Sequence, residues 1–223
     1  MKPYYEDPAV TIYWGDSLEL MPQLTQCGAD LVLTDPDYNS ERIRYGQHEK
    51  LGSEEYAAFC RRWFTLAQAI TPNLVFTPGV RNMWRYPEPR WVIIWHKSAS
   101  PAKSDLGGFN VWEPIMVYGQ QTCRFGHDLI RLELLNLTRG EWTKHPCPKQ
   151  ADLWSLLVAR TTRENDLILD PFLGSGTTCY VAKKLNRRCI GVEIEERFCH
   201  IAANRCRQTV MDLSGCEEPE CAR

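Results

Sequence analysis

Asp170-Pro171-Phe172-Leu173-Gly174-Ser175-Gly176-Thr177-Thr178 is the stretch of sequence that decides the fold. It follows the apolar run 167–169, which predicts a short buried strand, and it precedes residues 179–186, whose spacing predicts a helix. A strand that ends in an acid, turns through two glycines and enters a helix places backbone N–H groups and a positive helix end around a ligand. The two glycines allow positive φ and close approach of that ligand, and the serine between them adds a hydroxyl group.

A second acidic residue follows in the order expected of a nucleotide-type unit. Glu193 comes seventeen residues after Gly176, directly after the predicted strand 189–192. In such units an acid at the tip of the second strand binds ribose hydroxyls. A helix start built from small residues is the alternative, but the ordered series of strand, acid, glycine turn, helix, strand and acid favours a ribose-containing ligand.

The rest of the chain alternates strands with helices. Further strands are predicted at 11–14, 29–34, 74–76, 91–95 and 114–118, and further helices at 18–24, from Ser53 to about 67, at 150–160 and at 196–209. Uninterrupted apolar runs such as 31–33 suit a parallel sheet that is covered on both faces. The alternation predicts an α/β fold with a doubly wound, mostly parallel sheet of the Rossmann-like type.

Four acidic residues each follow or end a predicted strand: Asp16, Asp35, Asp170 and Glu193. In a doubly wound sheet, ligands bind outside the carboxyl ends of the strands, at a switch point. We therefore expect these four side chains to gather at one edge of the sheet. For Asp16 the alternative is that its carboxylate caps the following helix.

Two motifs resemble those of the DNA amino-methyltransferases, which methylate adenine N6 or cytosine N4. Residues 170–178 resemble the family's S-adenosylmethionine motif, and Asp35-Pro36-Asp37-Tyr38 resembles its (Asp/Asn/Ser)-Pro-Pro-(Tyr/Phe/Trp) element, from which it departs at Asp37. The resemblance covers about residues 11–207. The catalytic motif precedes the cofactor motif, as in the β group of the family, so a circularly permuted methyltransferase fold is implied.

The resemblance also implies roles for individual residues. Asp35 and the Pro36 carbonyl would accept the hydrogen bonds of the base amine, and Tyr38 would stack on the flipped base. The cofactor would be held by Asp170, Phe172, Gly174, Ser175, Gly176, Thr177 and Glu193, and by Asp16 in an element similar to the family's Gly-Asp element. His145 begins 145–150, which resembles the His-Pro-x-Gln-Lys-Pro element near the methionine end, but Pro148 and Gln150 depart from it.

The implied substrate is an exocyclic amine of a DNA base. Adenine N6 is preferred to cytosine N4, because family members with Asp at the first motif position lean toward adenine and those with Ser toward cytosine. The alternatives are a catalytically silent, methyltransferase-like subunit that binds nucleic acid, with Asp37 as the lesion, and a methyltransferase acting on RNA or a protein amide. The sulfonium methyl donor is already cationic, so no metal is expected.

Two readings of the cysteines compete with this assignment. Pro146-Cys147 resembles the nucleophile of cytosine carbon-5 methyltransferases, which need an activated thiolate but lack the Asp-Pro-x-Tyr element. A zinc site among residues 199–221 would draw on single cysteines with no close Cys-x-x-Cys pair. Packing or idle, reduced thiols are therefore the preferred interpretation of the ten cysteines.

Length and charge set the remaining expectations. The 223 residues predict a single domain, 1–223, with a small DNA-recognition insertion at about 121–144 and a frayed tail at about 212–223. The net charge is −2, but residues 81–149 hold ten basic and six acidic residues, so either a face for a polyanion or a mixed solvated surface is possible. Residues 39–51 and 97–144 are the candidate DNA face.

Localisation and partners complete the expectations. No signal peptide or membrane-spanning apolar run is found in the sequence, so a cytoplasmic protein without a membrane partner is expected. The short insertion predicts a short or relaxed target sequence, or a partner, either a homodimer or a specificity subunit, that supplies recognition.

Overall fold

The structure is a computed structural model that describes residues 1–39, 50–97, 104, 107–120, 126–132 and 151–207. Its strands are β1 (Tyr5–Glu6), β2 (Val10–Trp14), β3 (Leu31–Thr34), β4 (Leu74–Phe76), β5 (Trp91–His96), β6 (Trp112–Tyr118), β7 (Leu129–Arg131), β8 (Leu167–Asp170) and β9 (Arg188–Glu193). Its helices are α1 (Ser17–Leu20), η1 (Met21–Leu24), α2 (Ser53–Ile70), η2 (Met83–Arg85), α4 (Ala151–Thr161), α5 (Thr177–Lys184) and α6 (Glu196–Arg207), where η denotes a 3-10 helix.

The strands form one nine-stranded sheet in the order β1-β2-β9-β8-β3-β4-β6-β5-β7. The central strands β2, β9, β8, β3 and β4 run parallel to one another, and β6 is antiparallel to both β4 and β5. At the other edge β1 pairs antiparallel with β2. The prediction of a mostly parallel α/β sheet is confirmed.

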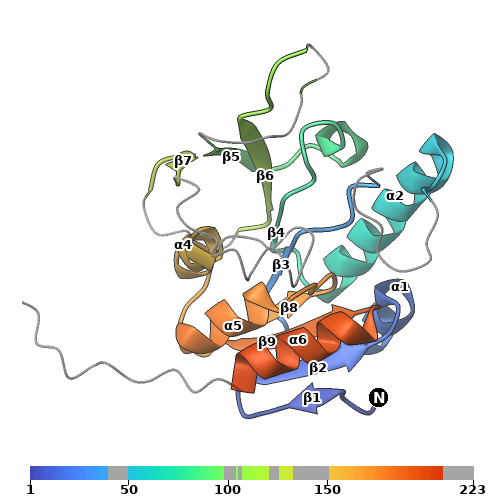
Figure 1. Cartoon of the computed structure of the whole chain (residues 1–223), viewed down its shortest axis with the longest axis vertical. Coiled ribbons are helices and arrows are strands. Elements are labelled where there is room, and N and C mark those ends of the chain that lie inside the picture. Colours follow the sequence, from blue (N-terminus) through green and yellow to red (C-terminus); the bar gives the residue numbers. More distant parts are fainter. Residues whose placement is uncertain (40–49, 98–103, 105–106, 121–125, 133–150, 208–223) are drawn as a thin grey trace, which may run out of the picture.

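Helices cover both faces of the sheet (Figure 1). On one face α4, α5 and α6 pack against side chains that include Leu31 and Leu33, and on the other α1, η1 and α2 pack against side chains that include Val32. Successive residues of a strand point to opposite faces, so the apolar run 31–33 supplies both cores. This is the doubly wound arrangement predicted from the uninterrupted apolar strands.

The switch point of the sheet lies between β8 and β3. After β8 the chain passes through α5 to β9 on one side, and after β3 it passes through α2 to β4 on the other side. Connections that diverge in this way leave a crevice outside the carboxyl ends of the two strands. The two sequence motifs begin at that crevice, because Asp170 ends β8 and Asp35 directly follows β3.

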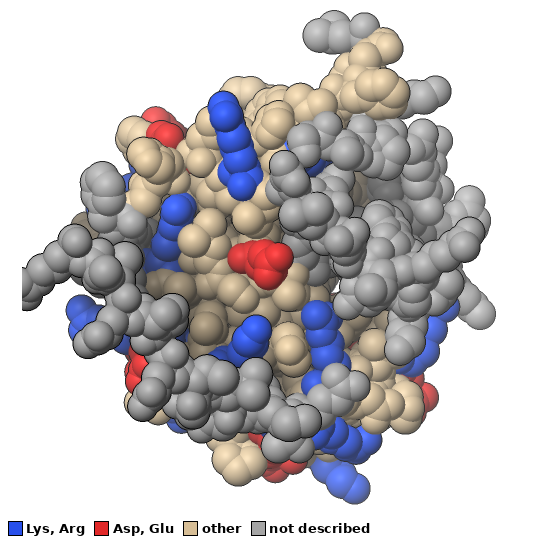
Figure 2. Space-filling model, turned by 60° about the vertical axis from the view of Figure 1, so that its left-hand side comes forward, with Lys and Arg blue, Asp and Glu red and all other residues tan. Residues whose placement is uncertain are grey.

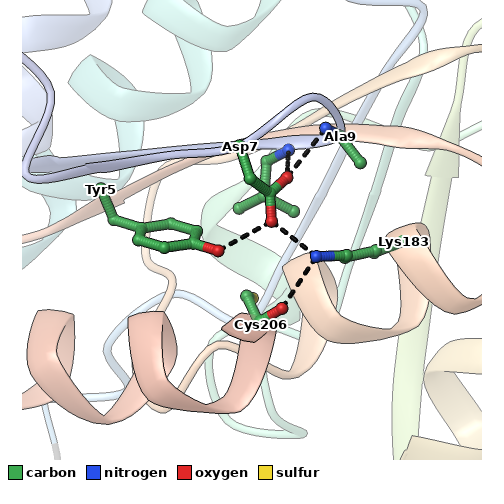
Figure 3. Close-up of polar contacts among 6 residues, drawn as sticks. Tyr5, Asp7, Ala9, Lys183 and Cys206 are labelled. Carbon is green, nitrogen blue, oxygen red and sulfur yellow. Dashed lines mark hydrogen bonds and ion pairs between the residues drawn. The ribbon is translucent and has the colours of Figure 1, made fainter. Parts of the chain in front are cut away.

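A polar cluster at the opposite, amino edge fastens the first strands to the last helices (Figure 3). Asp7 accepts hydrogen bonds from the hydroxyl of Tyr5 at 2.8 Å, from the backbone N–H groups of Ala9 and Val10 at 2.8 Å each, and from Lys183 Nζ at 2.6 Å. Lys183 also donates to the Cys206 carbonyl at 2.9 Å. The cluster therefore ties the turn before β2 to α5 and α6.

Several elements differ from the sequence predictions in detail. The helix expected at 18–24 is split into α1 and η1, since Pro22 has no N–H to continue an α-helix. Strands β1 and β7 were not predicted, and α5 begins at Thr177, two residues earlier than expected, because Gly176 is its N-cap. Most of the predicted insertion 121–144 and the whole predicted tail lie outside the described residues. Within the described residues, no helix is long and apolar enough to cross a membrane.

Candidate active site

Four acidic residues lie at the carboxyl ends of four neighbouring parallel strands. Asp16 follows β2, Glu193 ends β9, Asp170 ends β8 and Asp35 follows β3. Asp170 and Glu193 are buried, with 2% and 6% of their surface exposed. The predicted gathering of these residues at one edge of the sheet is confirmed.

Asp170 is bonded by hydroxyl groups from two other elements. Thr34, the last residue of β3, donates to Asp170 Oδ1 at 2.6 Å, and Thr178 in α5 donates to Oδ2 at 2.5 Å. The backbone N–H of Phe172 donates to Oδ1 at 3.0 Å. Burial, with a smaller contribution from the nearby charge of Asp35, raises the pKa of Asp170 to about 6 despite these three bonds. The Thr34 bond joins the strand end that precedes the Asp35 motif to the acid that begins the glycine turn.

Both glycines of the turn have a positive φ, and the packing around Gly176 explains why a glycine is needed there. Gly174 has φ 56° and Gly176 has φ 83°, so both occupy the left-handed region that favours glycine. A Cβ atom at Gly176 would lie 2.6 Å from the Cβ of Ala202, so this glycine permits the close packing of α5 against α6. The close approach of a ligand, predicted for both glycines, stays a prediction at Gly174, whereas Gly176 is explained by its packing against Ala202.

Glu193 links the tips of β8 and β9. Its Oε2 accepts the backbone N–H of Gly174 at 2.7 Å and its Oε1 accepts that of Glu195 at 2.8 Å. Burial raises the pKa of Glu193 to about 7, against these two hydrogen bonds and with a further contribution from the charge of Asp170. The carboxylate is held in place by backbone groups at the position expected of a ribose-binding acid.

The Asp35 carboxylate is oriented by two hydroxyl groups. Tyr38 Oη donates to Asp35 Oδ1 at 2.6 Å, and the hydroxyl of Thr77, which follows β4, donates to the same oxygen. Thr77 is fully buried, and Pro36, which follows Asp35 in the sequence, is buried as well. The carboxylate therefore has a fixed direction at the end of β3, next to the crevice.

Contacts of both the ring and the backbone hold Tyr38 in place. A Cβ atom at Gly79 would lie 3.3 Å from the ring, so the ring rests directly on that glycine. The Tyr38 carbonyl accepts a hydrogen bond from Asn82 Nδ2 at 3.3 Å. Together with the bond to Asp35, these contacts hold the aromatic ring beside the carboxylate.

Asp37, the position at which the motif departs from the family, closes a local turn. Its Oδ1 accepts the backbone N–H of Asn39 at 2.9 Å, and its carbonyl accepts the hydroxyl of Tyr56 in α2 at 2.7 Å. Aspartate commonly caps turns in this way. The residue thus contributes to the shape of the loop that carries Asp35 and Tyr38.

The remaining predicted site residues have mainly structural contacts. Asp16 caps α1, accepting the N–H of Leu18 at 2.8 Å, and the ring of Phe172 packs against Trp63 with 5.6 Å between centroids. Ser175 and Thr177 are buried, and the Thr177 hydroxyl accepts a bond from Arg205 at 3.0 Å. His145 lies outside the described residues.

Three threonines that organise the site were not predicted from the sequence: Thr34, Thr77 and Thr178. Thr34 and Thr77 each directly follow the apolar residues of a buried strand. A hydroxyl at that position can donate a hydrogen bond to an acid at the end of the neighbouring strand. A threonine at the end of a buried strand was therefore the sequence feature that could have predicted these bonds.

The charged surface is mixed. On the face shown in Figure 2, Lys and Arg side chains lie above, beside and below a central acidic side chain. Such a face offers positive charge to a polyanion without being uniformly basic. In the described part of the chain, no group of three His, Cys, Asp or Glu side chains is placed to hold a metal ion.

Known proteins are similar to this chain in both sequence and fold. The profile of the DNA methylase family matches residues 110–204. The Type II methyltransferase M.BglII of Bacillus subtilis is 48% identical over an alignment that covers 86% of this chain and 67% of the relative. The alignment therefore extends over most of this chain.

Two solved structures resemble the fold at lower sequence identity. The M1.HpyAVI–SAM complex superposes with a TM-score of 0.70 at 22% identity, covering 89% of this chain and 99% of the other. The PvuII DNA methyltransferase, described as cytosine-N4-specific, superposes with a TM-score of 0.72 at 19% identity, covering 92% and 88%. At these identities the similarity supports the arrangement of sheet and helices alone.

Proposed function

This chain belongs to the DNA methylase family and methylates an exocyclic amine of a DNA base, and we propose that the amine is N6 of adenine. The preference for adenine rests on Asp35 at the first motif position, and the observation that carries methyl transfer to an amine is the 2.6 Å hydrogen bond between Thr34 and Asp170. It joins the strand end of the Asp35 motif to the strand end of the glycine turn. A loop suited to hold an amine and a turn suited to hold a cofactor therefore share one crevice.

The carboxyl edge fits S-adenosylmethionine, the cofactor of this family. Glu193 provides a fixed carboxylate for ribose hydroxyls, and Gly174 provides a backbone without a side chain beside it. Burial raises the pKa values of Asp170 and Glu193, and a cationic sulfonium bound nearby would favour the ionised form of both acids. When bound, the cofactor provides an electrophilic methyl group.

The base amine is the substrate that Asp35 is placed to hold. An exocyclic amine is a poor nucleophile, because its lone pair is delocalised into the ring. The Asp35 carboxylate and the Pro36 carbonyl would each accept one N–H, favour the tetrahedral nitrogen and stabilise the positive charge that develops on it. The hydroxyls of Thr77 and Tyr38 would keep the carboxylate in that orientation.

The target base must leave the duplex to reach this crevice. The ring of Tyr38, fixed by Gly79 and Asp35, would stack on the flipped base, and one such stack contributes roughly 1–3 kcal/mol. Asp at the first motif position supports adenine as that base. Cytosine N4 is the second candidate, since the PvuII enzyme that shares the fold is described as cytosine-N4-specific.

The small size of the predicted insertion limits how many bases of the target sequence it can contact. We infer that residues 121–144 read few base edges, since each good contact is worth roughly 1–3 kcal/mol of discrimination. A short or relaxed target sequence is the direct consequence. A second copy of the chain or a specificity subunit would be needed for a longer one.

The assignment is tested by identifying the methylated nucleoside. The purified chain is incubated with unmethylated plasmid DNA and labelled S-adenosylmethionine, and the digested DNA is analysed by mass spectrometry. N6-methyladenine is expected. N4-methylcytosine in the digest would instead identify cytosine N4 as the methylated amine. A parallel incubation contains RNA. Label in the RNA but not in the DNA, or cofactor binding without any methyl transfer, would refute DNA methylation.

A further inference from the structure

Trp84 has the most exposed large hydrophobic side chain in the part of the chain that the structure describes, with 81% of its surface exposed. It lies in η2, the short helix that follows the carboxyl end of β4. This is the edge of the sheet to which Asp35 belongs, since β3 and β4 are parallel neighbours. A single exposed tryptophan needs no explanation, but this one is held beside the catalytic loop.

Asn82 fastens η2 to that loop. Its side chain is 8% exposed, and its Nδ2 donates to the carbonyls of Tyr38 at 3.3 Å and Pro78 at 3.2 Å. The ring of Tyr38 in turn rests on Gly79. The backbone of η2 and the residue proposed to stack on the base are therefore parts of one packed unit.

Arg85 fastens the other end of η2. Its guanidinium lies over the ring of Tyr56, 5.4 Å from the centroid, and the Tyr56 hydroxyl donates to the carbonyl of Asp37 at 2.7 Å. Arg85 also contacts Ser53 at the start of α2 at 3.5 Å. Trp84 is thus presented to solvent by a backbone that is bound on both sides to the catalytic loop and its neighbouring helix.

The charge around Trp84 suits a nucleic acid. The segment 81–90 carries Arg81, Arg85 and Arg90 against Glu88, and Arg81 is exposed. An exposed aromatic side chain on an arginine-rich segment is a combination with which proteins bind unstacked bases and the phosphate backbone.

We propose that Trp84 packs against the DNA next to the flipped base, with Arg81 facing the phosphate backbone. Flipping a base leaves a gap in the stack, and an indole carried on a backbone that is bound to the Tyr38 loop can cover the bases that border the gap. The proposal rests on the DNA methylation proposed above. It adds a DNA contact outside both sequence motifs.

The test compares Trp84→Ala with Trp91→Ala on plasmid DNA that the wild type methylates. Trp91 is a matched control, because it is also an exposed tryptophan, with 60% of its surface exposed, but it lies within the sheet. It is in β5, opposite Val117 of β6, which in turn pairs with Val75 of β4. The loss of one stack should raise the KM for DNA about 5- to 150-fold in Trp84→Ala. Trp84→Phe should recover most of that loss, and Trp91→Ala should behave as the wild type.

Two further measurements separate the possible outcomes. Cofactor affinity by calorimetry should be unchanged in Trp84→Ala, and Arg81→Gln should lower the slope of log affinity against log salt by about one, whereas Trp84→Ala should not. If the wild type methylates DNA and Trp84→Ala has the same KM for DNA, this inference is overturned but the proposed function is not. A wild type that neither binds nor methylates DNA would overturn the proposed function as well.

Discussion

Asp170 and Asp7 lie at opposite edges of the same sheet and are held in opposite ways. Asp170, at the carboxyl edge, is bonded by hydroxyls and one backbone N–H, and burial raises its pKa to about 6. Burial alone would also raise the pKa of Asp7, but hydrogen bonds from Lys183, Tyr5 and two backbone N–H groups outweigh it and lower the pKa. The carboxyl edge therefore raises the proton affinity of its buried acid, and the amino edge lowers that of Asp7.

This difference separates stability from function. A paired carboxylate such as Asp7 stabilises the ligand-free fold, whereas a buried acid without a cation destabilises it until a ligand supplies the missing charge. The carboxyl edge holds Asp170, Glu193 and the oriented Asp35, and it is the edge at which both sequence motifs meet. Changes there should alter binding and turnover, and changes at the amino edge should alter stability.

The largest expected effect is at the glycine turn. Gly174→Leu should abolish S-adenosylmethionine binding in a folded protein, because the new side chain would occupy the space where the ligand approaches the backbone. Gly28→Leu is the matched control, since Gly28 also has positive φ, has open space around it and precedes β3 at the amino edge. Both changes incur a similar backbone strain of about 1–2 kcal/mol.

Calorimetric titration distinguishes strain from obstruction in this pair. Gly28→Leu should bind the cofactor as the wild type does. Wild-type affinity in Gly174→Leu, or an equal loss in both variants, would remove the cofactor from this turn.

A smaller effect is expected at Thr77. Thr77→Val keeps the shape of the side chain but removes the hydroxyl that bonds Asp35, and hydrogen bonds to charged groups contribute about 1.5–3 kcal/mol. Turnover should fall roughly 10- to 100-fold, with an unchanged KM for the cofactor. Thr77→Ser, which keeps the hydroxyl, should restore the rate. Equal impairment in both variants would mean that packing around Thr77, and not the bond to Asp35, is what matters.

The smallest effects concern stability and pH. Because the folded-state pKa of Glu193 is raised to about 7, its stabilising, protonated form is lost as pH rises through that value. The stability of Glu193→Gln relative to the wild type should therefore increase by about 1–3 kcal/mol between pH 5 and pH 8 in ligand-free protein. Denaturant unfolding at several pH values measures this difference.

Asp7 should show the opposite sign. Its pKa is lowered, so its contribution is present above the unfolded value and is lost only as pH falls through the lower folded value. Asp7→Asn should be destabilised by about 1–2 kcal/mol, by the same amount at pH 5 and pH 8, and should approach the wild type only as pH falls through the lowered folded-state pKa of Asp7. A slope in Asp7→Asn between pH 5 and pH 8 would contradict the contrast between the two edges.

Much of this arrangement could be predicted because it depends on local signals. The acids at strand ends and the ordered glycine turn are visible in the sequence, and parallel strands then bring Asp35 and Asp170 together. The packing partner of Gly176 could not be predicted, since a glycine that faces Ala202 and one that faces a ligand look alike in sequence. The bonds of Thr34 and Thr77 were missed because they join residues that are distant in the chain.

The central claim, that Asp35 at the carboxyl edge holds the base amine, is tested most directly by the single-turnover rate of Asp35→Ala. Labelled S-adenosylmethionine is bound first, its affinity is measured, and transfer to DNA is then followed in Asp35→Ala, Asp7→Ala and the wild type. The account predicts an unchanged cofactor affinity and a rate about 100- to 1,000-fold lower in Asp35→Ala, with Asp7→Ala near the wild-type rate. A rate in Asp35→Ala within a few-fold of the wild type would contradict it.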